Sequence, residues 1–174
     1  MKITIPNLTL ASISFLFLST LCSDICYSQQ IPKVYTVKNK EYSINDSSSY
    51  FIILRNNHGC NNCYTSLNDY LLKLRNKVQA NFISISECDS NSLARKRNLA
   101  DTQNLMPDMN DYLFQYNCTK DNFFNNYSVD NTPVVVIVRN GKLTLIPYSE
   151  IFEISSTNIS SYAHQKFLTL LNGK

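Results

Sequence analysis

The stretch YFIILRNNHGCNNC, residues 50–63, decides the fold that we predict for this chain of 174 residues. It opens with an uninterrupted apolar run from Tyr50 to Leu54, between polar turn residues. Such a run is typical of a strand that is buried on both faces of a mainly parallel sheet. Two cysteines, Cys60 and Cys63, follow within a few residues. The sequence therefore predicts a core strand that leads directly into a Cys-x-x-Cys pair.

A helix is predicted immediately after the second cysteine, because apolar side chains recur there at helical spacing. The positions that follow this spacing are Tyr64, Leu67, Leu71, Leu74 and Val78. Basic residues gather toward the end of the same segment, where cations interact favourably with the helix dipole. The cysteine pair is thus expected at the start of a helix.

The rest of the chain alternates between further strands and helices. We predict strands at 81–86, 112–116, 134–138 and 142–146, and helical stretches at 90–105, 119–127 and in the last residues, 163–171. The Asn140-Gly141 pair is a strong signal for a two-residue hairpin. This alternation favours an α/β fold built on a central sheet.

Composition narrows the class of protein. Hydrophobic residues make up 44% and charged residues 17%, which fits one globular domain and excludes a disordered or coiled-coil chain. The formal net charge of +3 is too small to indicate a nucleic-acid partner. Three glycines in the whole chain argue against a glycine-rich phosphate-binding loop.

The N-terminus has the pattern of an export signal. Lys2 precedes an apolar stretch at 8–21, and small residues follow, so we expect residues 1–28 to be a signal peptide cleaved after Ser28. The alternative is a lipid anchor on Cys22, although Leu21 is bulky where lipoprotein signals carry a small residue. Either way the expected location is outside the cytoplasm, in the periplasm or cell envelope, or secreted.

Two further parts are expected after the leader. Residues 29–49 are mostly polar and form a lead-in segment with one short strand at 34–37, and residues 50–174 form the domain itself. Four cysteines remain in these parts, in a compartment where disulfides persist. Cys88 and Cys118 each follow a predicted strand, and the sequence leaves open whether they form a bridge or two separate thiols.

A buried strand leading into Cys60 and Cys63 at a helix start, with Thr132-Pro133 before a later hairpin and a final helix, resembles the thioredoxin superfamily. The resemblance covers residue 50 to the C-terminus. The extra helical sequence at 87–111 is similar to that of exported, membrane-associated thiol-disulfide oxidoreductases. The resemblance to the thioredoxin superfamily implies a thioredoxin-like three-layer α/β/α sandwich with a central mixed sheet.

The resemblance also implies roles for individual residues. Cys60 would attack a substrate disulfide, and Cys63 would resolve the mixed disulfide. Pro133 would follow a cis peptide bond, and the backbone of Thr132 would pair with an extended substrate. His58 is a candidate modulator of the Cys60 thiol. Expected partners are protein thiols or disulfides and a further redox partner, with no bound cofactor and a membrane tether as one option.

The chain departs from the family pattern at three places. His58-Gly59 stands where a Trp commonly precedes the pair, Leu54 replaces an acidic residue, and Asn61-Asn62 matches none of the common dipeptides. The proton relay that assists the second cysteine is therefore missing or replaced.

Two other functions stay open on the sequence. The pair could be a permanent disulfide in a non-catalytic thioredoxin-like binding module. Less favoured is a copper or zinc site formed by Cys60, Cys63 and His58, because the second histidine, His164, lies far away in the sequence.

Overall fold

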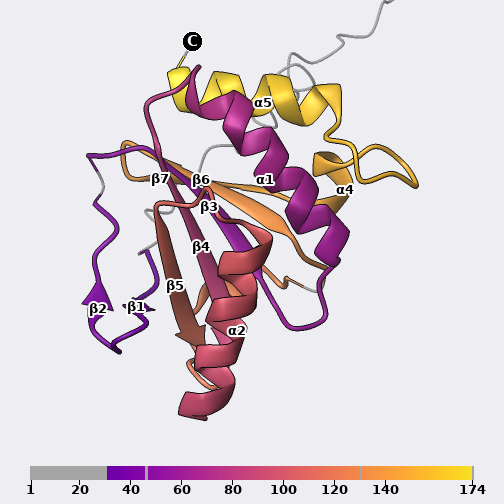
Figure 1. Ribbon diagram of the computed structural model, residues 1–174. Helices are drawn as coiled ribbons and strands as arrows, with labels where there is room; N and C mark the ends of the chain where they lie inside the picture. Colours follow the sequence, from indigo (N-terminus) through magenta and orange to yellow (C-terminus); the bar gives the residue numbers. More distant parts are fainter. Residues whose placement is uncertain (1–30, 46, 130, 174) are drawn as a thin grey trace, which may run out of the picture.

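The structure is a computed structural model that describes residues 31–45, 47–129 and 131–173. Its described residues form one seven-stranded sheet and five helices (Figure 1). The strands are β1 (Val34–Thr36), β2 (Glu41–Tyr42), β3 (Tyr50–Arg55), β4 (Asn81–Cys88), β5 (Asp111–Tyr116), β6 (Val134–Arg139) and β7 (Lys142–Ile146). The helices are α1 (Asn61–Arg75), α2 (Ser92–Leu105), α3 (Phe123–Asn126), α4 (Tyr148–Ile151) and α5 (Ser161–Asn172).

The sheet is open and mixed, with the strand order β2-β1-β5-β4-β3-β6-β7. Strands β3, β4 and β5 run parallel, whereas β6 pairs antiparallel with both β3 and β7. The predicted turn at Asn140 and Gly141 joins β6 to β7, and both residues have positive φ angles of 50° and 71°. The predicted α/β class with a mixed central sheet is confirmed.

Strand β3 lies inside the sheet, and all six of its residues are buried. Alternate side chains point to opposite faces, so β3 contributes to two separate cores. Phe51 and Ile53 pack with α1 and α5, whereas Ile52 and Leu54 pack with β6 and α3 on the other face. This double burial explains why the segment is apolar at every position.

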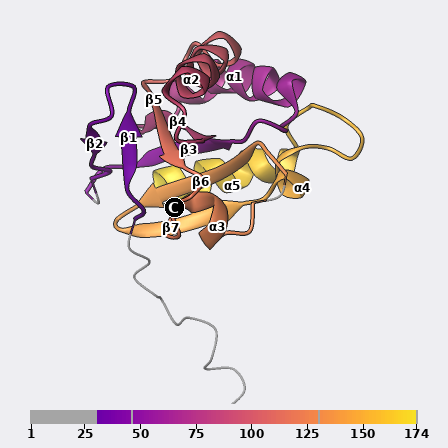
Figure 2. The same cartoon turned by 90° about the horizontal axis from the view of Figure 1, so that it is seen from below.

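The two faces of the sheet are covered unequally. Helices α1 and α5 supply the larger core, with Leu67 and Leu71 of α1 and Phe167 of α5 fully buried. Helix α2 lies beside α1, while the four-residue helix α3 covers the opposite face (Figure 2). The helix-rich face is the one that carries the cysteine pair.

The lead-in segment extends the sheet beyond β5. Strand β1 pairs antiparallel with β5 and with β2, and Val34 is fully buried. The Tyr42 hydroxyl donates to Asp111 Oδ2 at 3.1 Å, and burial raises the pKa of Tyr42 to about 12. Within the described residues, no helix is long and apolar enough to span a membrane. The predicted leader, residues 1–28, lies outside the described residues.

Candidate redox site

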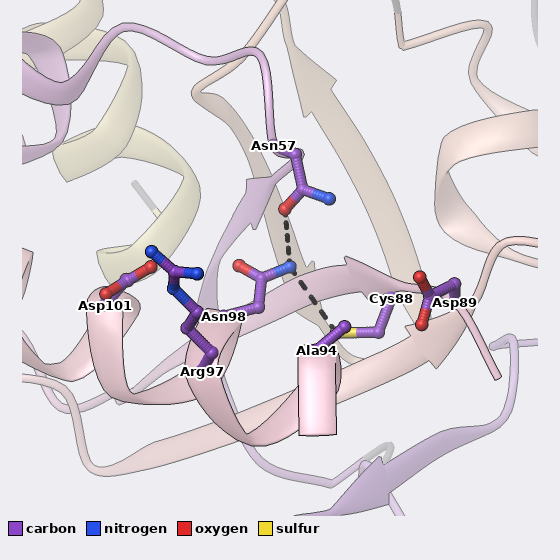
Figure 3. A pocket seen from close by; sticks show the side chains of 7 residues that line it. All are labelled: Asn57, Cys88, Asp89, Ala94, Arg97, Asn98 and Asp101. Carbon is purple, nitrogen blue, oxygen red and sulfur yellow. Dashed lines mark hydrogen bonds between the residues drawn. The ribbon is translucent and has the colours of Figure 1, made fainter. Parts of the chain in front are cut away.

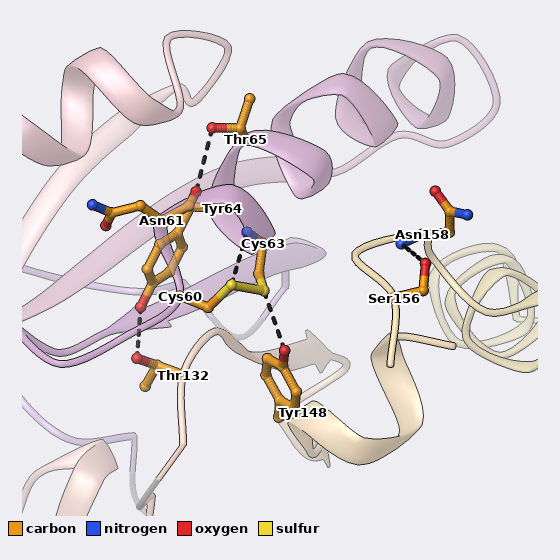
Figure 4. The surroundings of a disulfide bond; sticks show 9 residues. All are labelled: Cys60, Asn61, Cys63, Tyr64, Thr65, Thr132, Tyr148, Ser156 and Asn158. Atoms are coloured by element: carbon orange, nitrogen blue, oxygen red, sulfur yellow. Dashed lines mark hydrogen bonds between the residues drawn. A yellow bond between two sulfur atoms is a disulfide. The ribbon is translucent and has the colours of Figure 1, made fainter. Parts of the chain in front are cut away.

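The site begins where the loop after β3 enters α1. Cys60 is the N-cap residue of α1, and it forms a disulfide with Cys63, whose Cα lies 5.2 Å away (Figure 4). Cys60 is partly exposed, whereas Cys63, one turn into the helix, is fully buried. The arrangement gives one cysteine that a substrate can reach and one that it cannot.

The helix start surrounds Cys60 with hydrogen-bond donors. The Cys63 backbone N–H donates to Cys60 Sγ at 3.2 Å, in the manner of an N-cap side chain. The first N–H groups of a helix lack partners within the helix and mark the positive end of its dipole. A thiolate on Cys60 would therefore be stabilised once the disulfide is reduced.

The loop before β6 lies directly against the cysteine pair. The Thr132–Pro133 peptide bond is cis, as the resemblance implies. The Cys60 backbone N–H donates to the Thr132 carbonyl oxygen at 3.2 Å. The structure thus brings together the two motifs that the sequence separates by about 70 residues, and Pro133 is buried beside them.

The Thr132 side chain forms the centre of a buried polar network. Its hydroxyl accepts from the Tyr64 hydroxyl at 2.7 Å and donates to Asn56 Oδ1 at 2.7 Å. Thr132 is 3% exposed and Tyr64 is fully buried, and this burial raises the pKa of Tyr64 well above its usual range. The network links the loop after β3, helix α1 and the loop before β6, so it holds the surroundings of the pair in one geometry.

Gly59 leaves the space in which this network packs. A Cβ at this position would overlap both the Thr132 and the Tyr64 hydroxyl groups. A side chain immediately before Cys60 therefore has no room unless Thr132 and Tyr64 shift.

His58 is exposed in the turn before the pair. Its backbone N–H donates to Asn56 Oδ1 at 3.2 Å, which helps to shape the turn. Its modulating role on Cys60 stays a prediction.

The acidic group that is missing at Leu54 has no direct replacement on β3, because Leu54 is fully buried among apolar side chains. A different element reaches the second cysteine instead. The Tyr148 hydroxyl, at the start of α4, is 3.2 Å from Cys63 Sγ (Figure 4). The sequence predicts Tyr64 only as an apolar helix position, and no sequence signal marks Tyr148 or Asn56, because each of the three meets its partner only through the tertiary fold.

The two remaining described cysteines are separate thiols. Cys118 is exposed and Cys88 is buried. Cys88 lines a pocket of about 310 Å³ beside α2, where the Asn98 amide points to its sulfur at 3.6 Å and to Asn57 Oδ1 at 2.6 Å (Figure 3). Burial raises the pKa of Cys88 to about 11.

Among the described residues, no three or more His, Cys, Asp or Glu side chains are clustered so that they could hold a metal ion.

No protein-family model and no curated protein sequence matches the chain. Several solved structures share its fold. MTB DsbF, solved in mixed oxidised and reduced forms, superposes with a TM-score of 0.53 at 12% identity, covering 83% of this chain and 97% of that one. A thioredoxin-like protein from Porphyromonas gingivalis gives 0.55 at 16% identity, covering 83% and 93%.

A thiol-disulfide isomerase from Corynebacterium glutamicum gives a TM-score of 0.56 at 11% identity, covering 82% of this chain and 94% of that one. At these identities the similarity is one of fold. The chain therefore has a thioredoxin-like fold, and this fold places Cys60 and Cys63 within disulfide distance of each other.

Proposed function

We propose that this protein is an exported thiol-disulfide oxidoreductase that exchanges disulfides with protein substrates through Cys60 and Cys63. The observation that carries the proposal is the unequal exposure of the pair: Cys60 is accessible at a helix N-terminus, and its disulfide partner is fully buried. A nucleophilic thiol and a protected resolving thiol have these two environments.

The exchange proceeds in two steps. The Cys60 thiolate attacks one sulfur of a substrate disulfide, the substrate S–S bond breaks, and one substrate sulfur leaves as a thiolate that takes a proton from water. The Cys63 thiolate then attacks Cys60 Sγ, which forms the Cys60–Cys63 bond and releases the second substrate thiolate. The protein is oxidised and the substrate reduced, and the reverse sequence oxidises a substrate dithiol. No cofactor takes part.

The residues around the pair have positioning roles in this proposal. Thr132 and Pro133 border Cys60, so a substrate backbone would lie along Thr132 as an added strand. The buried bonds from Tyr64 and Asn56 to Thr132 would hold that edge in place. His58, exposed beside the nucleophile, would add positive charge to the approach path when it is protonated.

Export is part of the same proposal. Residues 1–28 would be removed as a signal peptide, which leaves residues 29–49 as lead-in and residues 50–174 as the domain. Mass determination of the N-terminus of the protein from its native host would then give a start at Gln29. A lipid-modified Cys22 would instead establish a membrane tether, and an intact Met1 in the cytoplasm would contradict export.

The direct test of exchange is covalent trapping. A Cys63→Ser variant keeps the nucleophile but cannot resolve, so it should accumulate mixed disulfides through Cys60 when it is incubated with oxidised insulin. The adducts should appear on non-reducing gels and disappear with excess thiol. The matched control is the Cys60→Ser/Cys63→Ser double variant. Both proteins also carry serine at Cys22, Cys26 and Cys118, because Cys118 is an exposed thiol, and the double variant should then trap nothing.

The trapping experiment also separates the proposal from a binding module with a fixed disulfide. Such a module would give no adduct above that of the double variant, although Cys60→Ser would still lower its stability. A Cys63→Ser protein that folds and traps nothing would contradict the resolving role assigned to Cys63.

A further inference from the structure

Tyr148 contacts one of the two reacting sulfur atoms. Its hydroxyl oxygen is 3.2 Å from Cys63 Sγ, and the ring points from α4 toward the disulfide (Figure 4). Because Cys63 Sγ is bonded to Cβ and to the other sulfur, it carries no hydrogen. The tyrosine hydroxyl is therefore the donor in this contact, and the sulfur is a weak acceptor.

The position of the Tyr148 hydroxyl is set by a ring contact and by hydrogen bonds to the backbone of α4. The ring lies 5.0 Å from the ring of Phe152, which is 5% exposed. Ser160 holds the end of α4 through two hydrogen bonds. Its backbone N–H donates to the Ile151 carbonyl oxygen at 2.8 Å, and its hydroxyl donates to the Glu150 carbonyl oxygen at 2.6 Å. The donor is thus held in place before any reaction occurs.

Other ionisable groups around the pair have different partners. On the sheet side, the Tyr64 hydroxyl donates to Thr132, and the exposed His58 precedes the pair in the loop. Within the described chain, Tyr148 is the one ionisable side chain with a hydrogen bond to either sulfur.

The nearest charged groups are also engaged elsewhere. The buried Arg55 guanidinium donates to the Asn98 side-chain oxygen, on the side of α2. On α4 itself, Glu150 forms an ion pair with Lys166 at 2.7 Å. With Leu54 in the position of the family's acidic residue, no described carboxylate is hydrogen bonded to Cys63.

We propose that Tyr148 is a catalytic residue, whose hydroxyl donates a hydrogen bond to the Cys63 sulfur and stabilises its thiolate in both directions of exchange. The inference rests on the proposed function. When the protein becomes oxidised, Cys63 loses its proton to water and attacks Cys60 Sγ, and the hydrogen bond favours that ionised form. When the protein is reduced, a thiolate attacks Cys60, Cys63 leaves with the electron pair, and the same hydroxyl stabilises the leaving group.

The expected size of the effect follows from hydrogen bonds to charged groups, which are stronger than neutral ones. Loss of such a bond should lower the thiolate population of Cys63 at neutral pH by about tenfold, equivalent to a rise of about one pKa unit. The Tyr148→Phe variant removes the hydroxyl and retains the ring that packs on Phe152, so it removes this hydrogen bond with little other change.

The test follows the two thiol steps separately with the aromatic disulfide dithiobis-nitrobenzoate. Cys22, Cys26 and Cys118 are first replaced by serine, so that the remaining accessible thiols are those of the pair. Attack by Cys60 on the reagent releases one coloured thiolate, and attack by Cys63 on the mixed disulfide releases a second. In Tyr148→Phe the second release at pH 7 should be about threefold slower, because the thiolate population falls about tenfold while each remaining thiolate, with a higher pKa, is more nucleophilic. The pH midpoint of this release should be about one unit higher, and the first release should change less than about twofold.

Tyr162→Phe is the matched control, because Tyr162 is 57% exposed on α5 and contacts Lys166 instead of the pair. It should change neither release. An unchanged second release in Tyr148→Phe would overturn the inference, and so would equal slowing of both releases together with a lower melting temperature, since that indicates a role in folding. Absence of a second release in the wild-type protein would overturn the proposed exchange itself, and the role of Tyr148 with it.

Discussion

Cys60 ends the loop before α1 and Cys88 ends strand β4, and the two cysteines differ in exposure and in hydrogen bonding. Cys60 is partly exposed and caps α1, where a backbone N–H donates to its sulfur at 3.2 Å. Cys88 ends β4 at 2% exposure, and its sulfur accepts a hydrogen bond from the Asn98 amide at 3.6 Å. Burial raises the pKa of Cys88 to about 11. A helix N-terminus supplies hydrogen-bond donors to the Cys60 sulfur, whereas burial keeps the Cys88 thiol protonated, so Cys60 is the one of the two that we expect to act as a nucleophile.

Removing the Cys60 thiol should have the largest effect on exchange activity. Cys60→Ser should reduce insulin disulfide reduction by at least about a thousandfold, because the attacking thiol is removed. Cys88→Ala should leave that rate within about twofold, since a buried neutral thiol takes no part. The rates are measured by insulin turbidity with dithiothreitol. Comparable losses in both variants would show that the two thiols are not functionally distinct.

A second change tests the packing that holds the nucleophile's loop. Gly59→Ala places a methyl group against the Thr132 and Tyr64 hydroxyls, both buried. We expect a loss of about 1–3 kcal/mol in the free energy of unfolding, as for other overpacked sites. The measurement is urea denaturation, with Asn62→Ala at an exposed position as the control. Equal stability of Gly59→Ala and wild type would mean that the loop relaxes freely.

A third prediction concerns the pH dependence of stability that the buried Cys88 thiol causes. The ordinary thiol pKa is 9.0, and in the folded protein it is raised to about 11. The unfolded chain therefore ionises first as pH rises, so the stability contributed by the neutral buried thiol is complete below pH 9 and is lost between about pH 9 and 11. Between pH 8 and 10.5, wild type should lose about 2 kcal/mol more than Cys88→Ala.

Urea denaturation of both proteins at the two pH values measures this difference, and buried tyrosines such as Tyr64 contribute equally to each. Parallel pH dependences of wild type and Cys88→Ala would mean that the Cys88 thiol is not desolvated.

The smallest expected effect concerns His58. Its ring is exposed, so its charge is screened by solvent and salt. His58→Ala should change the rate of Cys60 alkylation by iodoacetamide at pH 6 to 7 by less than about twofold. A much larger decrease would assign His58 a direct part in activating Cys60.

Much of the fold was predictable because its elements carry strong local signals. The apolar runs that became β3 and β6, and the helical spacing after Cys63, reflect burial on fixed faces. The two-residue strand β2 and the four-residue helix α4 were not predicted. Segments that short have no measurable periodicity, and they form through pairing with β1 and packing on α5.

The cysteine pair and Thr132-Pro133 were identified as candidate site residues from motifs, and the structure brings them into contact. Their roles remain predictions. The partners Tyr64 and Tyr148 could not be found in the same way, because 68 and 85 residues separate the hydrogen-bonded atoms. No spacing rule covers such separations, and a tyrosine at a helical apolar position fits an ordinary core residue equally well.

Redox titration of the purified protein, with alkylation and mass mapping of Cys60, Cys63, Cys88 and Cys118 at each potential, tests the central claim most directly. We predict a reversible couple between Cys60 and Cys63 above about −300 mV, the level below which structural disulfides typically lie. Cys88 and Cys118 should remain thiols throughout that range. A pair that stays oxidised well below about −300 mV would contradict the account and indicate a structural disulfide.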